Sequence, residues 1–121
     1  MTNTTIFLDL LKKKRGFYAA ILELTQDEYK KFQANRPLNE IRPLLNQKKV
    51  LLACINALEA ELIPFKSEIQ ATLQNLENPS AKVIQETIND LSSTLDEILR
   101  LDTLNQKHLQ LHLNTIKSAL V

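Results

Sequence analysis

The chain has 121 residues and contains one glycine, Gly16, which restricts the folds that it can adopt. A domain of sheets and hairpins normally needs glycine at turn positions with positive φ and builds its strands from Val, Thr, Tyr and Phe. The apolar residues here are dominated by 23 Leu and 10 Ile, with only 3 Val, and good helix formers occupy many of the other positions. The sequence therefore predicts an all-α fold.

The scarcity of glycine also excludes several classes of enzyme. A Walker loop, a dinucleotide-binding fingerprint and a nucleophile elbow each need several glycines, because the backbone must approach a ligand closely or turn sharply. The acidic cluster of Asp96, Glu97 and Asp102 has no His or Lys placed beside it by the sequence, so general acid-base catalysis has no support. We predict a protein that is not an enzyme and that binds no cofactor.

The spacing of apolar residues predicts a single domain over residues 1–121, folded as an elongated antiparallel bundle of three long helices. The helices are expected at about 5–35, 39–77 and 80–119, with breaks at Pro37 and Pro79. Pro64 interrupts the apolar stripe of the middle helix without shifting it, so this helix is expected to be kinked or split near that residue, with a kink favoured. Two adjacent apolar rows on the first helix predict contacts with at least two neighbours.

Several local features are also expected from residue types. Thr4 or Thr5 is expected to cap the first helix, and Gly16, inside that helix, is expected to mark close packing or a local bend. Pro43 should lie in the first turn of the middle helix, where its missing N–H costs little. Cys54, which lies in an apolar run, should be a buried structural thiol.

The last helix is expected to begin near Pro79, with Asn78 or Ser80 as its cap. Its main apolar row contains Ile84, Ile88, Leu91, Leu95 and Ile98. Asp102 and Asn105 then interrupt this row, which predicts either a shift of the packing seam or a place where neighbouring helices end and water enters. A second row takes over the apolar character at Leu101, Leu104, His108 and Leu111.

Charge is divided unevenly along the chain, although the net value is only +1. The first 49 residues carry ten basic and five acidic side chains, and the remainder carries five basic and nine acidic ones. Attraction between the two halves across the bundle is the favoured interpretation, and a basic partner-binding face is the alternative. The basic run 12–15 beside Phe17 and Tyr18 does not outweigh a sequence pI of about 7.8, so no nucleic-acid partner is predicted.

His108 and His112 are spaced so that both project from one helical face, as zinc ligands can. No Glu follows His108 and the chain has a single cysteine, so no metal site is predicted. The apolar runs fall short of a membrane span, and the basic residues follow rather than precede the apolar stretch 6–11. We therefore predict a cytoplasmic protein with no membrane insertion.

Two longer stretches are similar to parts of a known family. The middle helix contains residues 47–59, QKKVLLACINALE, and the last helix contains residues 101–111, LDTLNQKHLQL. A lysine before a Leu-rich middle helix and an Asn-rich, Leu-rich stretch late in the last helix resemble the FlgN family of type III flagellar export chaperones, and the resemblance spans nearly the whole chain. His108 stands where that family often has a second asparagine, three residues after Asn105.

The resemblance implies a small cytoplasmic α-helical chaperone. Such a protein binds the C-terminal amphipathic segment of a secreted hook-filament junction protein, keeps it unpolymerised, and delivers it to the export machinery. By resemblance, the binding region would be the last helix from about Asn105 onward. A coiled-coil scaffold or adaptor subunit of a secretion apparatus is the alternative function.

Apolar residues late in the chain indicate the same region for a different reason. They occur on more than one face of the last helix, in excess of one packing stripe, and such a surface suits a partner helix. The predicted partner-binding residues are Leu104, Asn105, His108, Leu109, Leu111, His112, Leu113, Ile116 and Leu120. The alternatives are self-association through these residues, as a weak homodimer, and a simple contact with a fourth helix.

Overall fold

The structure is a computed structural model that describes residues 2–75 and 77–120, without the side chains of residues 116, 119 and 120. The described residues form helices and no strand, which confirms the predicted all-α fold. The elements are α1 (Asn3–Gln33), α2 (Leu38–Leu62), a 3₁₀ turn (Ile63–Phe65), α3 (Lys66–Leu73) and α4 (Pro79–Leu120).

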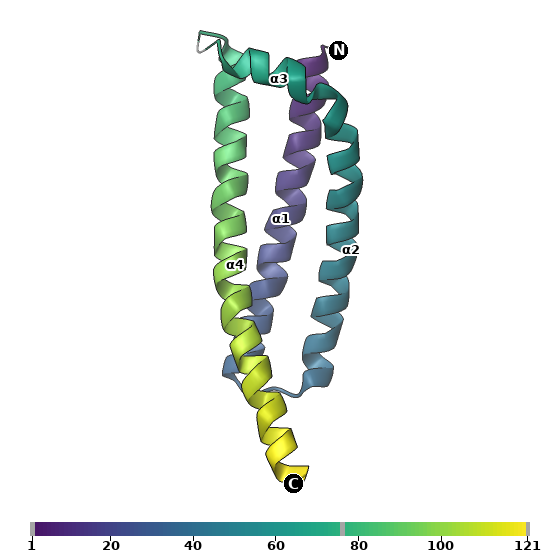
Figure 1. Cartoon of the computed structure of the whole chain (residues 1–121), viewed down its shortest axis with the longest axis vertical. Coiled ribbons are helices and arrows are strands. Elements are labelled where there is room, and N and C mark those ends of the chain that lie inside the picture. Colours follow the sequence, from purple (N-terminus) through teal and green to yellow (C-terminus); the bar gives the residue numbers. More distant parts are fainter. Residues whose placement is uncertain (1, 76, 121) are drawn as a thin grey trace.

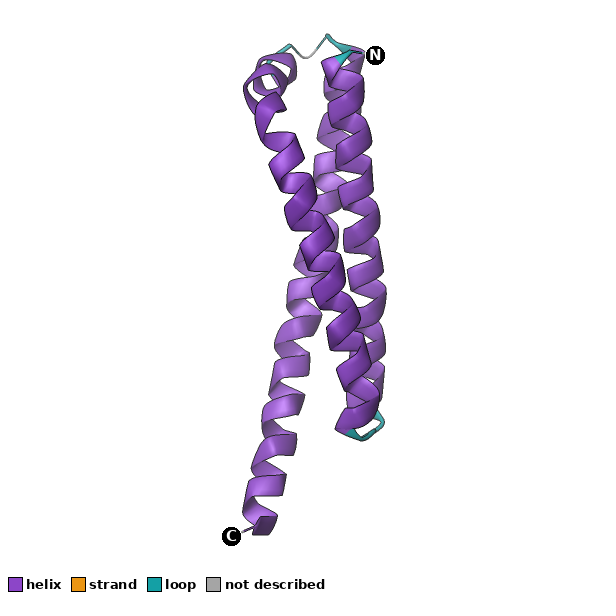
Figure 2. Cartoon of the chain, turned by 90° about the vertical axis from the view of Figure 1, so that its right-hand side faces the viewer, coloured by secondary structure: helices purple, strands orange, loops and turns teal. Residues whose placement is uncertain are grey.

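The helices form an elongated bundle whose chain runs down, up and down again (Figure 1). α1 and α2 are antiparallel, α3 crosses one end of the bundle, and α4 then runs antiparallel to α2. α1 packs along both α2 and α4, which confirms the two neighbours expected from its apolar rows. The last turns of α4 extend past the connection between α1 and α2 and stand clear of the other helices (Figure 2).

The cap of α1 lies two or three residues earlier than expected. Thr2, rather than Thr4 or Thr5, is the capping residue, and its hydroxyl accepts a hydrogen bond from the Thr5 N–H at 3.1 Å. The expectation was wrong because three threonines lie close together at the start of the chain and each of them is a good capping residue.

The other end of α1 turns without glycine. Asn35 has a φ of 54°, in the left-handed region where glycine is usual and asparagine is the next best residue. The Asn35 N–H donates to the Phe32 carbonyl at 3.1 Å, and the Arg36 N–H donates to the Lys31 carbonyl at 2.9 Å. This pair of bonds is the Schellman motif, so an asparagine supplies the turn that glycine supplies in most helices.

The predicted middle helix is split at Pro64, not merely kinked. Residues 63–65 form a 3₁₀ turn, after which α3 runs across the end of the bundle from α2 toward α4 (Figure 1). Proline has no N–H for the α-helical ladder and clashes with the preceding turn, which explains the break. The apolar stripe survives the break because Ile69 of α3 points into the core.

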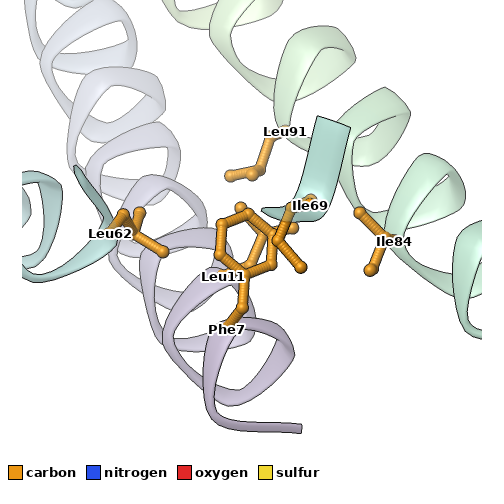
Figure 3. Packing of buried hydrophobic residues seen from close by; sticks show 6 residues of the cluster. All are labelled: Phe7, Leu11, Leu62, Ile69, Ile84 and Leu91. Atoms are coloured by element: carbon orange, nitrogen blue, oxygen red, sulfur yellow. The ribbon is translucent and has the colours of Figure 1, made fainter. Parts of the chain in front are cut away.

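A cluster of apolar side chains fills the end of the bundle that α3 covers (Figure 3). Its buried members are Phe7, Leu11, Leu62, Ile69, Ile84 and Leu91. These residues come from all four α-helices, and burial of each such side chain stabilises the fold by about 2 kcal/mol. A second, smaller cluster further along the bundle contains Ile21, Ile55 and Ile98.

Two further local expectations for the middle helix are wrong. α2 begins at Leu38, so Pro43 lies beyond the first turn, on an exposed side where water can bond to the carbonyl that the proline leaves unpaired. Cys54 is half-buried rather than buried, because the neighbouring Ile55 takes the fully buried position of that turn.

Ion pairs link the basic first part of the chain to the acidic remainder, in agreement with the charge distribution. Lys14 of α1 pairs with Glu59 of α2, and Arg15 of α1 lies 3.5 Å from Asp90 of α4. Arg15 and Asp90 are both well exposed, so their pair adds little to stability.

Gly16 is exposed on α1, and a Cβ built there would meet nothing within 4 Å, so the glycine marks no close packing. Replacing it with alanine (Gly16→Ala) is expected to raise the free energy of unfolding by about 0.8 kcal/mol, because glycine loses more backbone entropy in a helix. Urea unfolding followed by circular dichroism would measure the change. Ala19→Gly, at another exposed position of α1, should lower stability by a similar amount; a Gly16→Ala variant less stable than the parent would contradict the prediction.

Candidate partner-binding groove

A groove separates α2 from α4 on one side of the bundle. Both helices pack along α1, but over the described residues they lack the extensive contact with one another that each makes with α1. The groove holds a cavity of about 630 Å³, whose walls come from α2 and α4 and whose base includes Glu28 and Phe32 of α1. The result is a bundle of three long helices with one open side.

The α2 wall carries two parallel rows of residues spaced seven apart. Leu38, Leu45 and Leu52 form an apolar row, and Arg42 and Lys49 form a basic row beside it. Residues seven apart lie on the same helical face because they are separated by almost two complete turns. Leu45 and Leu52 are exposed although they are large and apolar, as expected for a surface that has no covering element.

The α4 wall explains why one residue of the predicted packing row is exposed. Leu95 is 37% exposed, whereas Leu91 and Ile98 of the same row are buried. Leu95 lies seven residues before Asp102, which is itself seven residues before Leu109, and the latter two line the groove. Leu95 therefore faces the extension of the groove and not α1, and its assignment to the packing row was wrong.

Exposed leucines lie on the α2 wall of the groove and on the turns of α4 that precede its α4 wall. Leu99 lies seven residues before Gln106, which lines the groove, and is 55% exposed. The set that we call the groove leucines consists of Leu45, Leu52, Leu95 and Leu99. Single exposed leucines are common on protein surfaces. Here Leu45 and Leu52 line the groove, and the heptad spacing places Leu95 and Leu99 on the same side of α4 as its lining residues, which together suit a partner.

A buried ion cluster crosses the floor of the groove. Lys48 Nζ of α2 lies 3.0 Å from Glu28 Oε1 of α1 and 2.8 Å from Asp102 Oδ1 of α4. Glu28 is 2% exposed and Lys48 8%. Glu28 Oε1 and Lys48 Nζ are close enough for a direct ion pair, although no other group of the described residues bonds to that oxygen. One lysine thereby joins the three long helices.

Asn105 connects this cluster to the contact between α1 and α4. Its side-chain amide donates to the Thr25 carbonyl at 3.2 Å and to Glu28 Oε2 at 3.4 Å, while its Oδ1 is buried with no hydrogen-bond partner among the described residues. Asn105 is buried and follows Ile98 by seven residues, so it keeps its place in the packing row. The packing seam does not shift, because Asn105 stays in the packing row and bonds to α1. Asp102 lines the groove and is partly exposed, so the expectation of water access holds at that residue.

Burial raises the pKa of Glu28 above its usual value, because the carboxylate loses its hydration in the folded protein. Contact with Lys48 and the charge of that lysine oppose the rise, the charge of Asp102 adds to it, and the hydrogen bond from Asn105 opposes it. The stability linked to this group is fully present below the ordinary pKa of glutamate and is lost as pH rises through the raised value.

The pattern of seven-residue repeats contains a signal for the ion cluster. Lys48 and Asn105 each occupy a repeat position whose other buried members are apolar, and Glu28 occupies a row that holds the buried Phe7 and Ile21 as well as Lys14. Each follows a buried isoleucine by seven residues, namely Ile21, Ile41 and Ile98. Three helices that each place one polar residue in a buried row predict that these residues meet, because a lone buried charge would be too costly.

The structure distributes the predicted partner-binding residues among several environments. Asn105 and Leu109 line the groove. His108, Leu111 and His112 line a smaller cavity of about 270 Å³ beside the connection between α1 and α2. Leu104 is half-buried, Leu113 is exposed, and the side chains of Ile116 and Leu120 lie outside the described residues. The predicted set thus contributes to the groove through two members and does not form one continuous face.

His108 is held by the aromatic residues of α1. Its ring stacks on Phe32 with centroids 5.9 Å apart, meets the Tyr29 ring edge-on at 6.2 Å, and its Nε2 lies 3.1 Å from the Gln33 side-chain nitrogen. Within the described part of the chain, no three His, Cys, Asp or Glu side chains come together as a metal site would require. The environment of His108 is therefore that of a packed structural residue.

Comparisons of the chain with protein-family models, with curated proteins and with solved structures found no match. Among the helices in the described ranges, none combines the length and the apolarity needed to cross a membrane. The groove between α2 and α4 is therefore the feature from which a function can be inferred.

Proposed function

We propose that this protein is a non-catalytic chaperone that binds an amphipathic helix of a client protein in the groove between α2 and α4. The single observation that carries the proposal is the set of groove leucines on two helices that each pack along α1 but lack extensive contact with each other. A helix docked there would cover these leucines and complete a bundle of four long helices.

The resemblance to the FlgN family supports a particular client. This client would be the C-terminal amphipathic segment of a secreted hook-filament junction protein, which the chaperone keeps unpolymerised in the cytoplasm before type III export. Asn105 and Leu109 belong both to the region that the resemblance implies and to the lining of the groove. Release at the export machinery requires reversible binding, and a client that orders only when bound has a lower affinity for a given buried area.

Leu52→Asp tests the proposal. We expect it to weaken binding of the C-terminal segment of the hook-filament junction protein from the same organism at least tenfold, because the docked helix would bury an unpaired carboxylate. Leu52 is exposed in the free protein, so the variant should fold normally. Isothermal titration calorimetry on the full chain would measure the dissociation constant, and circular dichroism would check the helicity.

Val50→Asp is the matched control, because Val50 lies on α2, is 64% exposed and does not line the groove. Unchanged binding by Leu52→Asp, or an equal loss in both variants, would contradict binding in the groove. The alternative function, a scaffold subunit of a secretion apparatus, is favoured by the end of α4 that stands clear of the bundle. An oligomer that forms without client and persists on dilution in sedimentation experiments would identify the scaffold.

A further inference from the structure

We infer that the helix bound in the groove carries carboxylates along one edge, the edge that faces Arg42 and Lys49 of α2. The inference rests on the proposed function and adds the chemical character of the partner. It predicts an asymmetric client helix, acidic on the side of α2 and uncharged on the side of α4.

The charged residues that line the groove differ in whether they already have partners. Lys48 contacts Glu28 at 3.0 Å and Asp102 at 2.8 Å, so the two carboxylates of the groove share one buried cation. Arg42 and Lys49 are exposed, and neither forms an ion pair with any residue in the described part of the chain. Two cations are therefore available to a partner, and no unpaired carboxylate of the lining opposes them.

The order of residues around α2 places these cations at the rim. Each residue advances the helix by about 100°, so Leu45 lies about 40° from the buried Ile41, and Arg42 lies about 100° from it. Seven residues later, Leu52 likewise lies about 40° around the helix from the buried Lys48, and Lys49 lies about 100° from it. A docked helix would thus rest its apolar stripe on the leucines and bring one flank against Arg42 and Lys49.

The two cations are about 10 Å apart along α2, which matches carboxylates seven residues apart on a roughly parallel or antiparallel partner helix. The opposite rim, on α4, offers Gln106 and the exposed Leu99 and no cation among the residues that line the groove. The requirement for acidic residues therefore falls on one edge of the partner only.

A second copy of this chain would not supply such an edge through the end of α4. Residues 103–121 contain no Asp or Glu and include Lys107 and Lys117, so this segment would bring further positive charge to the basic rim. Charge complementarity therefore favours a client helix from another protein over the free end of α4 of a second molecule.

The test uses three synthetic peptides of about 21 residues, each with the same leucine stripe and with Glu, Gln or Lys along one edge. Their dissociation constants for the full-length protein would be measured by fluorescence anisotropy at about 50 mM and about 300 mM salt. We expect the acidic peptide to bind about tenfold more tightly than the basic one at low salt, and the difference to shrink at high salt.

The double variant Arg42→Glu/Lys49→Glu should reverse the order of the acidic and basic peptides. The matched control, Lys12→Glu/Lys13→Glu, makes the same change of charge at two exposed lysines of α1 outside the groove and should preserve the order. A reversal in both double variants would show that net charge alone decides the preference, and would overturn the inference.

Other outcomes separate the inference from the proposed function. If the protein binds the three peptides with equal affinity and Leu52→Asp abolishes that binding, the inference of an acidic edge is wrong, whereas helix binding in the groove is supported. A dimer that persists on dilution and excludes every peptide would make a second copy the occupant and overturn both. Binding of no peptide by a monomeric protein would also overturn both.

Discussion

Replacing Lys48 with methionine (Lys48→Met) is expected to lower the free energy of unfolding by about 3 kcal/mol at pH 7. Methionine has a side chain of similar length, but it leaves the buried Glu28 carboxyl without its cation, and removal of one partner of a buried ion pair is strongly destabilising. Asp102, which is partly exposed, loses its partner at a lower cost. Urea unfolding at constant ionic strength would measure the effect.

The loss in Lys48→Met should be smaller at pH 5 than at pH 7. Burial already raises the pKa of Glu28, and the contact with Lys48 is what opposes the rise, so without Lys48 the pKa moves higher still. Protonation at lower pH then removes the uncompensated charge from the folded state. Comparing the variant with the parent at each pH cancels the contributions of all other groups.

The double variant Glu28→Gln/Lys48→Met provides the control for this interpretation. It removes the buried carboxylate while keeping a side chain that can accept the Asn105 hydrogen bond, so it should recover more than half of the lost stability at pH 7. The difference in the free energy of unfolding between this double variant and the parent should also vary less with pH than the difference for Lys48→Met. Lys49→Met, at the exposed neighbouring lysine, should change stability by less than about 0.5 kcal/mol. A Lys48→Met protein as stable as the parent at pH 7 would contradict a stabilising role for the cluster.

Ile84→Ala is expected to lower the free energy of unfolding by about 4 kcal/mol. Ile84 is 0% exposed and belongs to the cluster in which all four α-helices meet, so truncation leaves a cavity that no single helix can move to fill. Because α3 is held there by few other elements, its contact with α4 should weaken first. Hydrogen exchange of the α3 amides, together with urea unfolding, would detect both effects.

Val83 provides the matched control for Ile84. It is the preceding residue of α4 and is 39% exposed, so Val83→Ala should cost less than about 1 kcal/mol. Ile84→Val removes a single methyl group and should cost about 1 kcal/mol, which keeps the comparison available if Ile84→Ala does not fold. Equal effects of Ile84→Ala and Val83→Ala would mean that the cluster is not the main core of this end of the bundle.

The start of the last helix was the most predictable of the helix boundaries. Asn78 and Pro79 were expected at the start of the last helix, and α4 begins at Pro79 with the Ser80 N–H bonded to Asn78 Oδ1 at 2.9 Å. These residues act locally, through a fixed φ or a side-chain oxygen within reach of the backbone, so the sequence is sufficient to identify them.

The groove was not predictable from one helix at a time. Periodicity shows that Leu95 lies near an apolar row, but it does not show that α2 stands away from α4 and leaves that side uncovered. The direction of α3 was not predictable either, because Pro64 predicts a break in the helix but not the angle between the helices on its two sides. The apolar excess near the end of α4 correctly pointed to a surface, whereas the α2 wall, with Leu45 and Leu52, was missed.

The ion cluster on the groove floor has a consequence for how a bound helix is aligned. The apolar lining is interrupted at one level by Lys48 and Asp102, while Leu45 and Leu52 lie to either side of that level along α2. A client helix that slid by one heptad, about 10 Å, would bring a different set of its side chains over the charges and lose its match to them. If a helix binds as proposed, the ion cluster would favour one register of that helix along the leucine-lined groove.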